Sequence, residues 1–537
     1  MIRTIDGQML KNMLISAANN LSNNRKTVDD LNVFPVPDGD TGTNMSMTIL
    51  AVKRELENSD DTTCCGVSEI AARASLRGAR GNSGVILSQF LRGLSKGLSG
   101  MEIIEIPEIV GAMKQSVDVA YRAVMKPTEG TILTVAREMY EAADSWDADN
   151  ADILDFFKFV VTKGEESLNN TPNLLPQLKQ AGVVDSGGAG LLTLVKGAYL
   201  CLQGDPVVLF DEEVKTEESA KAVPAENIKF GYCTEFIIRK KEQKVPWKNL
   251  RKTLEGIGDS VIVVDDFDII KIHVHTENPG IALEEGKKFG ELLDIKIDNL
   301  REENRILIEK EKAEKAKPLV DFGFVAVAAG EGMIQIFEEL GCTEIISGGQ
   351  TMNPSTEDFL DRIEKINAKT TYLLPNNKNI LLAAEQAKEL SDKNVVVLTT
   401  KTLVQGISAL LAFDPDASEE ENTEVMNAVI GDVKSGSVTF AARNSNVDGI
   451  EIKKDDIMGL VEGKIKVITK DVSEAVLEVL EKMGADSTST ISLYYGEDVK
   501  EDDANEVLAL IEDKIIGADV NVYNGGQPLY YYYISVE

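Results

Sequence analysis

The sequence predicts a multidomain protein with an all-α domain first, a small α+β domain second and an α/β domain third. Its 537 residues exceed the about 250 to 300 residues at which a single hydrophobic core stops growing. Apolar residues first recur at helical spacing, the pattern changes after an acidic segment with two prolines, and strand-like and helical segments alternate from there on. We therefore expect domains at residues 1–204, 229–298 and 318–537, with a linker at 205–228 and a charged connecting helix at 299–317.

The first domain is predicted to be helical almost throughout. Apolar residues recur every three or four positions in the segments 9–21, 45–56, 84–98, 109–124, 132–143, 153–168 and 189–202. Strand-like alternation is scarce there. We therefore expect helices that are joined by loops rich in glycine.

One of these loops, at residues 32–45, carries two carboxylates one residue apart, Asp38 and Asp40. Both can point at the same divalent cation, and Mg²⁺ prefers one or two carboxylates together with water and phosphate oxygens. The start of the next helix would aim its positive end and its backbone N–H groups at an anion. The residues that offer these groups are Thr41, Gly42, Thr43 and Asn44. The loop therefore predicts a site for a metal ion and a phosphate group.

Two other metal loops do not fit these residues. An EF-hand would need an oxygen ligand at Gly42 and a glutamate where Ile49 stands. An aspartyl-phosphate enzyme would place its two aspartates after a central strand, which the two prolines before Asp38 exclude. An ordinary turn remains an alternative, because Pro-Asp-Gly-Asp is common turn chemistry.

Three further helix starts, in the loops 77–84, 126–131 and 184–190, share the composition of the first. Each brings glycines together with hydroxyl, amide or carboxylate groups, and the first also brings two arginines. Any one of them could be only a helix cap. Four such starts in one domain favour a single polar pocket that binds phosphate. The candidate residues are Arg80, Gly81, Asn82, Ser83, Gly84, Thr128, Thr131, Asp185, Gly187 and Gly188.

The four loops together resemble the nucleotide-binding (Dak2) domain of the dihydroxyacetone-kinase family. This resemblance implies a barrel of antiparallel helices that binds ATP through two Mg²⁺ ions held by aspartates. The sequence departs from the family pattern of three aspartates, because Asn32 stands where the first is expected. Its amide oxygen can still bind Mg²⁺, so the resemblance implies a magnesium site made of Asn32, Asp38 and Asp40.

The whole chain is similar to the ATP-binding, catalytic subunits of bacterial two-component fatty acid kinases. The resemblance implies transfer of phosphate from ATP to a fatty acid carboxylate, which gives acyl phosphate and ADP. It also implies a fatty-acid-binding carrier protein of the DegV type as partner. Asp38, Asp40 and Arg80 are then the expected catalytic residues. A kinase of a small ketone or polyol and a nucleotide-gated scaffold without net transfer remain alternatives.

An ionised acceptor agrees with the residues of the first domain. A hydroxyl acceptor benefits from a general base, and residues 1–204 contain no histidine to act as one. A carboxylate is already ionised at neutral pH, since its ordinary pKa is about 4. An aspartate can also act as a base, so this argument favours the fatty acid without excluding a hydroxyl.

The second domain is predicted to have the β-α-β-β-α-β order of a ferredoxin-like fold. The expected strands are 230–239, 260–264, 269–275 and 293–297, and the expected helices are 247–257 and 279–292. His273 and His275 share a strand face, and Cys233 on the first strand could approach them. These three residues could bind zinc, or they could be two exposed histidines and a buried cysteine. The resemblance to fatty acid kinase subunits implies zinc, in a structural or regulatory role.

The third domain alternates strands and helices, which predicts a parallel sheet. The loops 348–356 and 374–379 follow strands, at the edge where ligands bind in such sheets. Both resemble the substrate subunit of dihydroxyacetone kinase, which captures its substrate through a histidine that this domain lacks. The loops are therefore either scaffold or a candidate docking face for a partner. For residues 530–533, four consecutive tyrosines, we favour packing over an exposed edge strand.

Composition excludes several classes of function. The net charge of −33 disfavours a nucleic-acid groove, which needs clustered Lys and Arg. No apolar run reaches the about 18 residues of a membrane span, and the first 21 residues follow an amphipathic pattern unlike a signal peptide. Five irregularly spaced cysteines fit a reducing cytoplasm. The sequence is also compatible with a homodimer.

Overall fold

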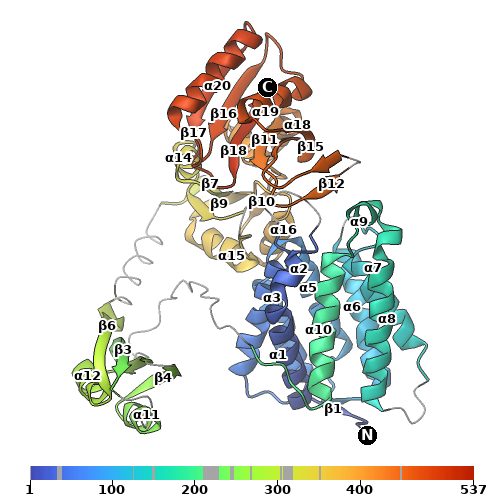
Figure 1. Cartoon of the computed structure of the whole chain (residues 1–537), viewed down its shortest axis with the longest axis vertical. Coiled ribbons are helices and arrows are strands. Elements are labelled where there is room, and N and C mark those ends of the chain that lie inside the picture. The colour runs from blue at the N-terminus through green and yellow to red at the C-terminus, as the bar shows by residue number, and fades with distance from the viewer. Residues whose placement is uncertain are drawn as a thin grey trace. The chain divides into compact units, whose positions relative to one another are not determined.

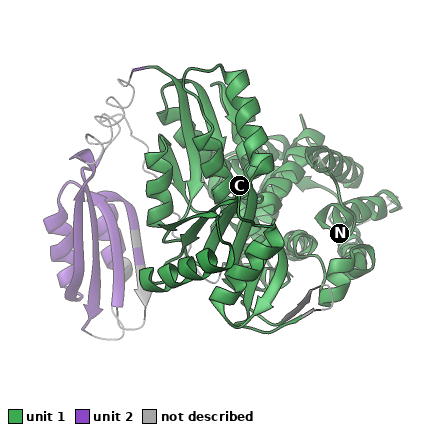
Figure 2. Cartoon of the chain, turned by 90° about the horizontal axis from the view of Figure 1, so that it is seen from above, with its two compact units in different colours: residues 1–213, 319–537 green, residues 214–318 purple. Residues whose placement is uncertain are grey.

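The chain forms two compact units, one of residues 1–213 and 319–537 and one of residues 214–318 (Figure 2). The first unit has a helical part and an α/β part. The computed structural model describes residues 2–32, 39–124, 126–147, 152–209, 229–241, 247–266, 269–302, 305, 318–349, 352–447 and 450–537. Within these ranges, no helix combines the length and the apolar character that crossing a bilayer requires.

The helical part packs its helices around one buried apolar core (Figure 1). Its helices are α1 (Gly7–Asn23), α2 (Arg25–Asp29), α3 (Thr41–Glu57), α4 (Cys64–Arg77), α5 (Gly81–Gly97), α6 (Ile106–Ala123), α7 (Ile132–Asp144), α8 (Ile153–Leu174), α9 (Pro176–Ala181) and α10 (Ser186–Leu202). Two short antiparallel strands are β1 (Ile5–Asp6) and β2 (Ile103–Ile104). All seven helices expected from the apolar spacing are present, so the prediction of a helical first region is confirmed.

Helix α4 is one that the sequence did not predict. Its buried apolar side chains, Cys64, Val67, Ala71 and Ala74, are small, so the helical pattern is weak. Its start is nevertheless well marked, because the Thr63 hydroxyl accepts a hydrogen bond from the Gly66 N–H at 3.0 Å.

The α/β part contains a four-stranded sheet in the order β10-β9-β7-β8, with every pair parallel. Both of its faces are covered, because Phe324 and Ala326 lie in one apolar cluster whereas Val325 and Val327 lie in another. The prediction of a parallel sheet is confirmed. Its elements are β7 (Val320–Ala328), α14 (Glu331–Glu339), β8 (Glu344–Ser347), α15 (Thr356–Lys365), β9 (Ala368–Leu374), α16 (Leu381–Leu390), β10 (Val395–Val397), α17 (Leu403–Leu411) and α18 (Glu419–Asp432).

A second sheet follows in the order β15-β14-β11-β18-β16-β17, and only β16 and β17 pair parallel among its described strands. Its elements are β11 (Lys434–Phe440), β14 (Ile457–Val461), β15 (Lys464–Thr469), α19 (Val472–Met483), β16 (Thr490–Tyr495), α20 (Glu501–Lys514), β17 (Asp519–Asn524) and β18 (Tyr530–Val536), and a separate hairpin is formed by β12 (Ser445–Val447) and β13 (Ile450–Ile452). The four tyrosines lie in β18, an interior strand, and Tyr532 is only 1% exposed. The packing interpretation is confirmed, and the edge-strand alternative is wrong.

The helical and α/β parts of the first unit share an apolar cluster. Ala79 and Val85, at the start of α5, are buried with Phe359 of α15 and Ile380 before α16. The Thr356 N–H donates to the Ala79 carbonyl at 3.1 Å, which fixes the start of α15 beside the start of α5. The two parts are therefore joined next to the loop that the sequence marked as a phosphate cradle.

The second unit has the predicted β-α-β-β-α-β order. Its elements are β3 (Tyr232–Lys240), α11 (Trp247–Glu255), β4 (Gly258–Asp266), β5 (Ile269–Thr276), α12 (Pro279–Lys287) and β6 (Gly290–Asn299), and the antiparallel sheet has the order β4-β5-β3-β6. Alternate residues of β5, including Ile272 and Val274, are buried in the apolar core. His273 and His275 project from the other face. Most of the expected connecting helix at 299–317 and of the linker at 205–228 lies outside the described residues.

Candidate functional site

A polar cavity of about 240 Å³ lies where α3 and α5 begin. Six of the residues that line it were predicted from the sequence, and two, Lys378 and Asn379, come from the α/β part. The lining residues are Asn32, Asp40, Thr41, Asn44, Asn82, Ser83, Lys378 and Asn379. The structure thus brings the first two predicted helix starts to one pocket. Asp38 lies outside the described residues.

Asp40 is the N-cap residue of α3, but its side chain makes no capping hydrogen bond. Instead, the Asn353 amide donates to Asp40 Oδ2 at 2.5 Å and lies 3.5 Å from Asn44 Oδ1. Such donors orient carboxylates that bind metals. Asn353 therefore reaches from the α/β part to a candidate magnesium ligand.

Glycines allow the starts of α3 and α5 to approach each other. Gly81 has a φ of +55°, and a Cβ atom there would lie 2.6 Å from Asn44 Nδ2. A Cβ atom on Gly84 would lie 2.4 Å from Thr48 Oγ1. Both distances are shorter than any ordinary contact, so a larger residue at either position would force a side chain of α3 to move.

Thr43 does not line the cavity. Its hydroxyl donates to Asp29 Oδ2 at 2.9 Å, and its N–H donates to Asp29 Oδ1 at 3.0 Å. Burial raises the pKa of Asp29, although the hydrogen bonds from Thr43 and Gly42 oppose this shift. The sequence interpretation did not include Asp29, because an aspartate that lies 14 residues before Thr43 gives no local sign that it will cap α3.

Arg80 lies beside the cavity, but its guanidinium faces the α/β part. Its Nη1 donates to the Asn353 carbonyl at 2.8 Å and lies 3.3 Å from Asp358 Oδ2. The side chain is 16% exposed. Arg80 therefore joins the two parts of the first unit and is not among the residues that line the cavity.

The other two predicted loops act as caps in the structure. Thr131 caps α7 through Leu133 N–H at 3.4 Å and donates to the Thr128 carbonyl. The Asp185 carboxylate caps α10 by accepting from Gly188 N–H at 2.7 Å. Burial raises the pKa of Asp185 to about 6. None of these residues, nor Gly187, lines the described cavity.

These caps nevertheless lie near α3. A Cβ atom on Gly190 in the first turns of α10 would lie 2.7 Å from Met45 Sδ on α3, and one on Gly187 would lie 3.2 Å from Ile132 Cβ at the start of α7. The start of α10 therefore lies beside both α3 and the start of α7, and a pocket shared by all four helix starts stays a prediction.

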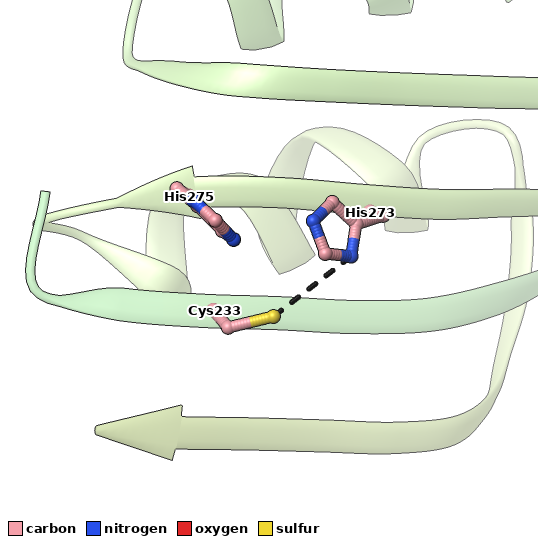
Figure 3. A group of neighbouring side chains, drawn as sticks. All are labelled: Cys233, His273 and His275. Carbon is pink, nitrogen blue, oxygen red and sulfur yellow. Dashed lines mark hydrogen bonds between the residues drawn. The ribbon is translucent and has the colours of Figure 1, made fainter. Parts of the chain in front are cut away.

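A second cluster, in the 214–318 unit, contains Cys233, His273 and His275 (Figure 3). One ligand atom from each lies within 4.8 Å of the others, and Cys233 Sγ lies 3.8 Å from His273 Nδ1. Two zinc ligands at ordinary bond lengths and a tetrahedral angle lie about 3.6 Å apart. Glu235 Oε1 lies 2.9 Å from the same nitrogen, His273 Nδ1, so a metal ion bound at this nitrogen would replace the contact with Glu235. The three side chains therefore fit one metal ion.

Comparison with protein families agrees with this organisation. The DAK2 domain matches residues 35–200, which include the cavity residues Asp40, Thr41, Asn44, Asn82 and Ser83. The chain is thus a DAK2-domain protein. The middle and C-terminal domains of the FakA-like fatty acid kinase family match residues 229–306 and 323–537. An uncharacterised protein of Staphylococcus aureus strain MRSA252 is 43% identical over 549 residues, with 100% of both chains covered. The chain belongs to the FakA-like family of fatty acid kinase proteins.

Solved structures align more weakly. Dihydroxyacetone kinase from C. freundii, in complex with AMP-PNP and Mg²⁺, aligns with a TM-score of 0.29 and 14% identity over 37% of this chain and 35% of that one. The Streptococcus pneumoniae fatty acid kinase B3 protein loaded with linoleic acid aligns with a TM-score of 0.30 and 14% identity over 41% of this chain and 99% of that one. Family membership, rather than these alignments, implies an ATP-binding kinase.

Proposed function

We propose that this chain transfers the γ-phosphoryl group of ATP to the carboxylate of a fatty acid. The observation that carries the proposal is the polar cavity at the starts of α3 and α5, with the Asp40 carboxylate in its wall, in a chain of the FakA-like family. A carboxylate oxygen bonds to the γ-phosphorus, and the bond to the bridging oxygen of ADP breaks. The products are acyl phosphate and ADP. The acceptor is already ionised and loses no proton.

The donor set of the cavity fits Mg²⁺. Asn32 and Asp40 offer hard oxygen atoms there, and Asp38 would join them. The resemblance to the dihydroxyacetone-kinase family implies two ions. Magnesium would neutralise charge on the phosphates. Thr41, Asn44, Asn82, Ser83 and the N–H groups around Gly42, Gly81 and Gly84 would bind the phosphate oxygens. In this proposal, Arg80 keeps Asn353 beside the cavity by donating a hydrogen bond to the Asn353 carbonyl.

The starts of α7 and α10 would complete the nucleotide site. Thr131 and Asp185 cap these helices, the Thr128 carbonyl accepts a hydrogen bond from the Thr131 hydroxyl, and Gly187 and Gly188 leave no room for a side chain beside Ile132 and Val135. Their place beside α3 supports a role for the remainder of the nucleotide. Thr43 would contribute to the site indirectly, because its hydroxyl donates a hydrogen bond to Asp29 and so holds the start of α3 in place.

The fatty acid would be presented by a separate DegV-type carrier. A solved protein of this kind, the fatty acid kinase B3 protein, was loaded with linoleic acid. We propose the α/β part as the docking surface for the carrier, because its Asn353 and Lys378 loops already lie at the phosphate cavity. Zinc would be held by Cys233, His273 and His275 in the other unit, in a structural or regulatory role.

The test combines the purified chain, MgATP and a DegV-type protein loaded with linoleic acid. We expect ADP and acyl phosphate, trapped as a hydroxamate, only when all three are present, and a loss of at least about 100-fold for Asp40→Asn. Turnover of dihydroxyacetone without a carrier would instead make the chain a ketone kinase. Nucleotide binding without ADP formation in any mixture would make it a nucleotide-gated scaffold.

A further inference from the structure

We infer that Lys378, in the α/β part, contacts the nucleotide phosphates in the cavity at the starts of α3 and α5. This inference rests on the proposed function and adds a residue to its site. Lys378 lies on the loop between β9 and α16, far from Asp40 in sequence but in the wall of the same cavity.

Charge supports this role. A bound triphosphate carries several negative charges, and Asp40 adds another to the cavity. Among the described residues that line the cavity, Lys378 is the one with a positively charged side chain. Its flexible stem and compact ammonium group suit a phosphate contact.

Arg80 does not supply this charge in the structure. Its guanidinium is held by the Asn353 carbonyl at 2.8 Å and by Asp358 at 3.3 Å. Moving it toward a phosphate would break both contacts, which join the two parts of the first unit. Lys378 is exposed and lies in the cavity wall.

The loop that carries Lys378 is fixed on both sides. The Asn376 amide donates to the Val327 carbonyl at 3.0 Å, and the Asn376 N–H donates to Thr400 Oγ1 at 3.0 Å. Ile380, 0% exposed, packs in the same apolar cluster as Val85 of α5. The loop is therefore held at a set position relative to the phosphate-binding start of α5.

Helix α16 begins just beyond this loop, at Leu381. Three helices, α3, α5 and α16, thus begin at or beside one cavity, and none of their N-cap residues makes a side-chain capping hydrogen bond. Their positive ends add to the field of Lys378 and favour an anion between them.

The experiment measures MgATP affinity by calorimetry on the full-length chain. We expect Lys378→Met to weaken binding by at least about tenfold, Lys378→Glu to weaken it further, and Lys378→Arg to stay within about threefold of the parent chain. Lys401→Met is the matched control, since Lys401 is an exposed lysine of the α/β part that does not line this cavity. The melting temperature without nucleotide should be the same for Lys378→Met and Lys401→Met.

Asp40→Asn separates the two proposals. One outcome is that the parent chain binds MgATP, that Asp40→Asn fails to bind it, and that Lys378→Met binds it as tightly as the parent chain. This outcome would overturn the inference about Lys378 but leave the nucleotide site in place. If the parent chain fails to bind MgATP, the proposed function fails first. A second outcome is that Lys378→Met and Lys378→Arg both bind MgATP weakly and that Lys378→Met also melts at a lower temperature than the parent chain. Lys378 would then be a structural residue, and the inference would also be overturned.

Discussion

At the residue scale, the proposed zinc site depends on three side chains, those of Cys233, His273 and His275. Strand pairing sets Cys233 opposite His275 and Glu235 opposite His273, so the cluster depends on the register of β3 and β5. We expect about one zinc ion per parent chain and a nearly complete loss in Cys233→Ala. Elemental analysis of the purified proteins measures this. Cys201→Ala, at a free cysteine on α10, is the control, and equal zinc in both variants would end the proposal.

Asp185 gives a pH prediction. Its pKa is about 6 in the folded protein and near 3.8 in the unfolded chain, because folding buries the carboxyl group. The folded state therefore binds more protons between these values. The contribution of Asp185 to stability is complete below about pH 4 and is lost as the pH rises through about 6.

Asp185→Asn removes this titration but keeps a capping side chain. Relative to the variant, the parent chain should lose on the order of 2 kcal/mol of stability between pH 4 and pH 7. Urea unfolding of the two proteins, followed by circular dichroism without nucleotide, measures the difference. If the difference in free energy of unfolding between the two proteins stays constant from pH 4 to pH 7, burial does not control the protonation of Asp185.

At the element scale, Gly93 of α5 sets the distance of this helix from α6. A Cβ atom on Gly93 would lie 2.4 Å from Ser116 Cα. Gly93→Ala should therefore destabilise the helical part by about 1 to 3 kcal/mol, although alanine is the better helix former. Gly111→Ala on α6 is the matched control. A Cβ atom there meets nothing within 4 Å, so this change should stabilise by about 0.5 to 1 kcal/mol. Thermal unfolding that shifts in the same direction for both variants would contradict this packing.

The sequence predicted elements where large apolar residues repeat. Helices such as α5 and α7 were recognised because large apolar residues recur on their buried faces every three or four positions. Helix α4 was missed because its buried face is made of small residues. The antiparallel strands β11 and β14 were also missed. Strand β11 pairs with the distant β18 as well as with β14, and buried strands of this length give no decisive pattern.

The candidate site was predictable only where it is local. Asp40, Asn44 and Ser83 were recognised because glycines and polar groups cluster at helix starts. Asn353 was not, because its bond to Asp40 spans 313 residues and no local pattern encodes it. The loop of Lys378 was noticed as a ligand-type loop, but the sequence alone could not show that it lines the cavity of another domain.

At the scale of the whole molecule, the distribution of histidines constrains the chemistry. Both histidines of the chain lie in the unit of residues 214–318, on β5. The unit that contains the polar cavity proposed to bind the nucleotide therefore has no histidine, neither as a general base for a hydroxyl acceptor nor for covalent capture of a ketone. An acceptor that is already ionised agrees with this arrangement, which again favours a carboxylate.

The joint between the helical and α/β parts makes a final prediction. Because Asn353 contacts Asp40 and Thr356 N–H donates to Ala79, MgATP in the cavity should stabilise both sides of the joint against local opening. Hydrogen exchange should slow at residues 352–358 as well as at residues 39–46.

Asp40→Asn, which removes a metal ligand from the proposed site, is the control and should show no nucleotide-dependent slowing on either side. Slowing that is confined to the helical part in the parent chain would mean that the α/β part does not respond to the nucleotide. The contacts of Asn353 and Thr356 would then be only structural, and nucleotide binding would not affect a docking surface on the α/β part.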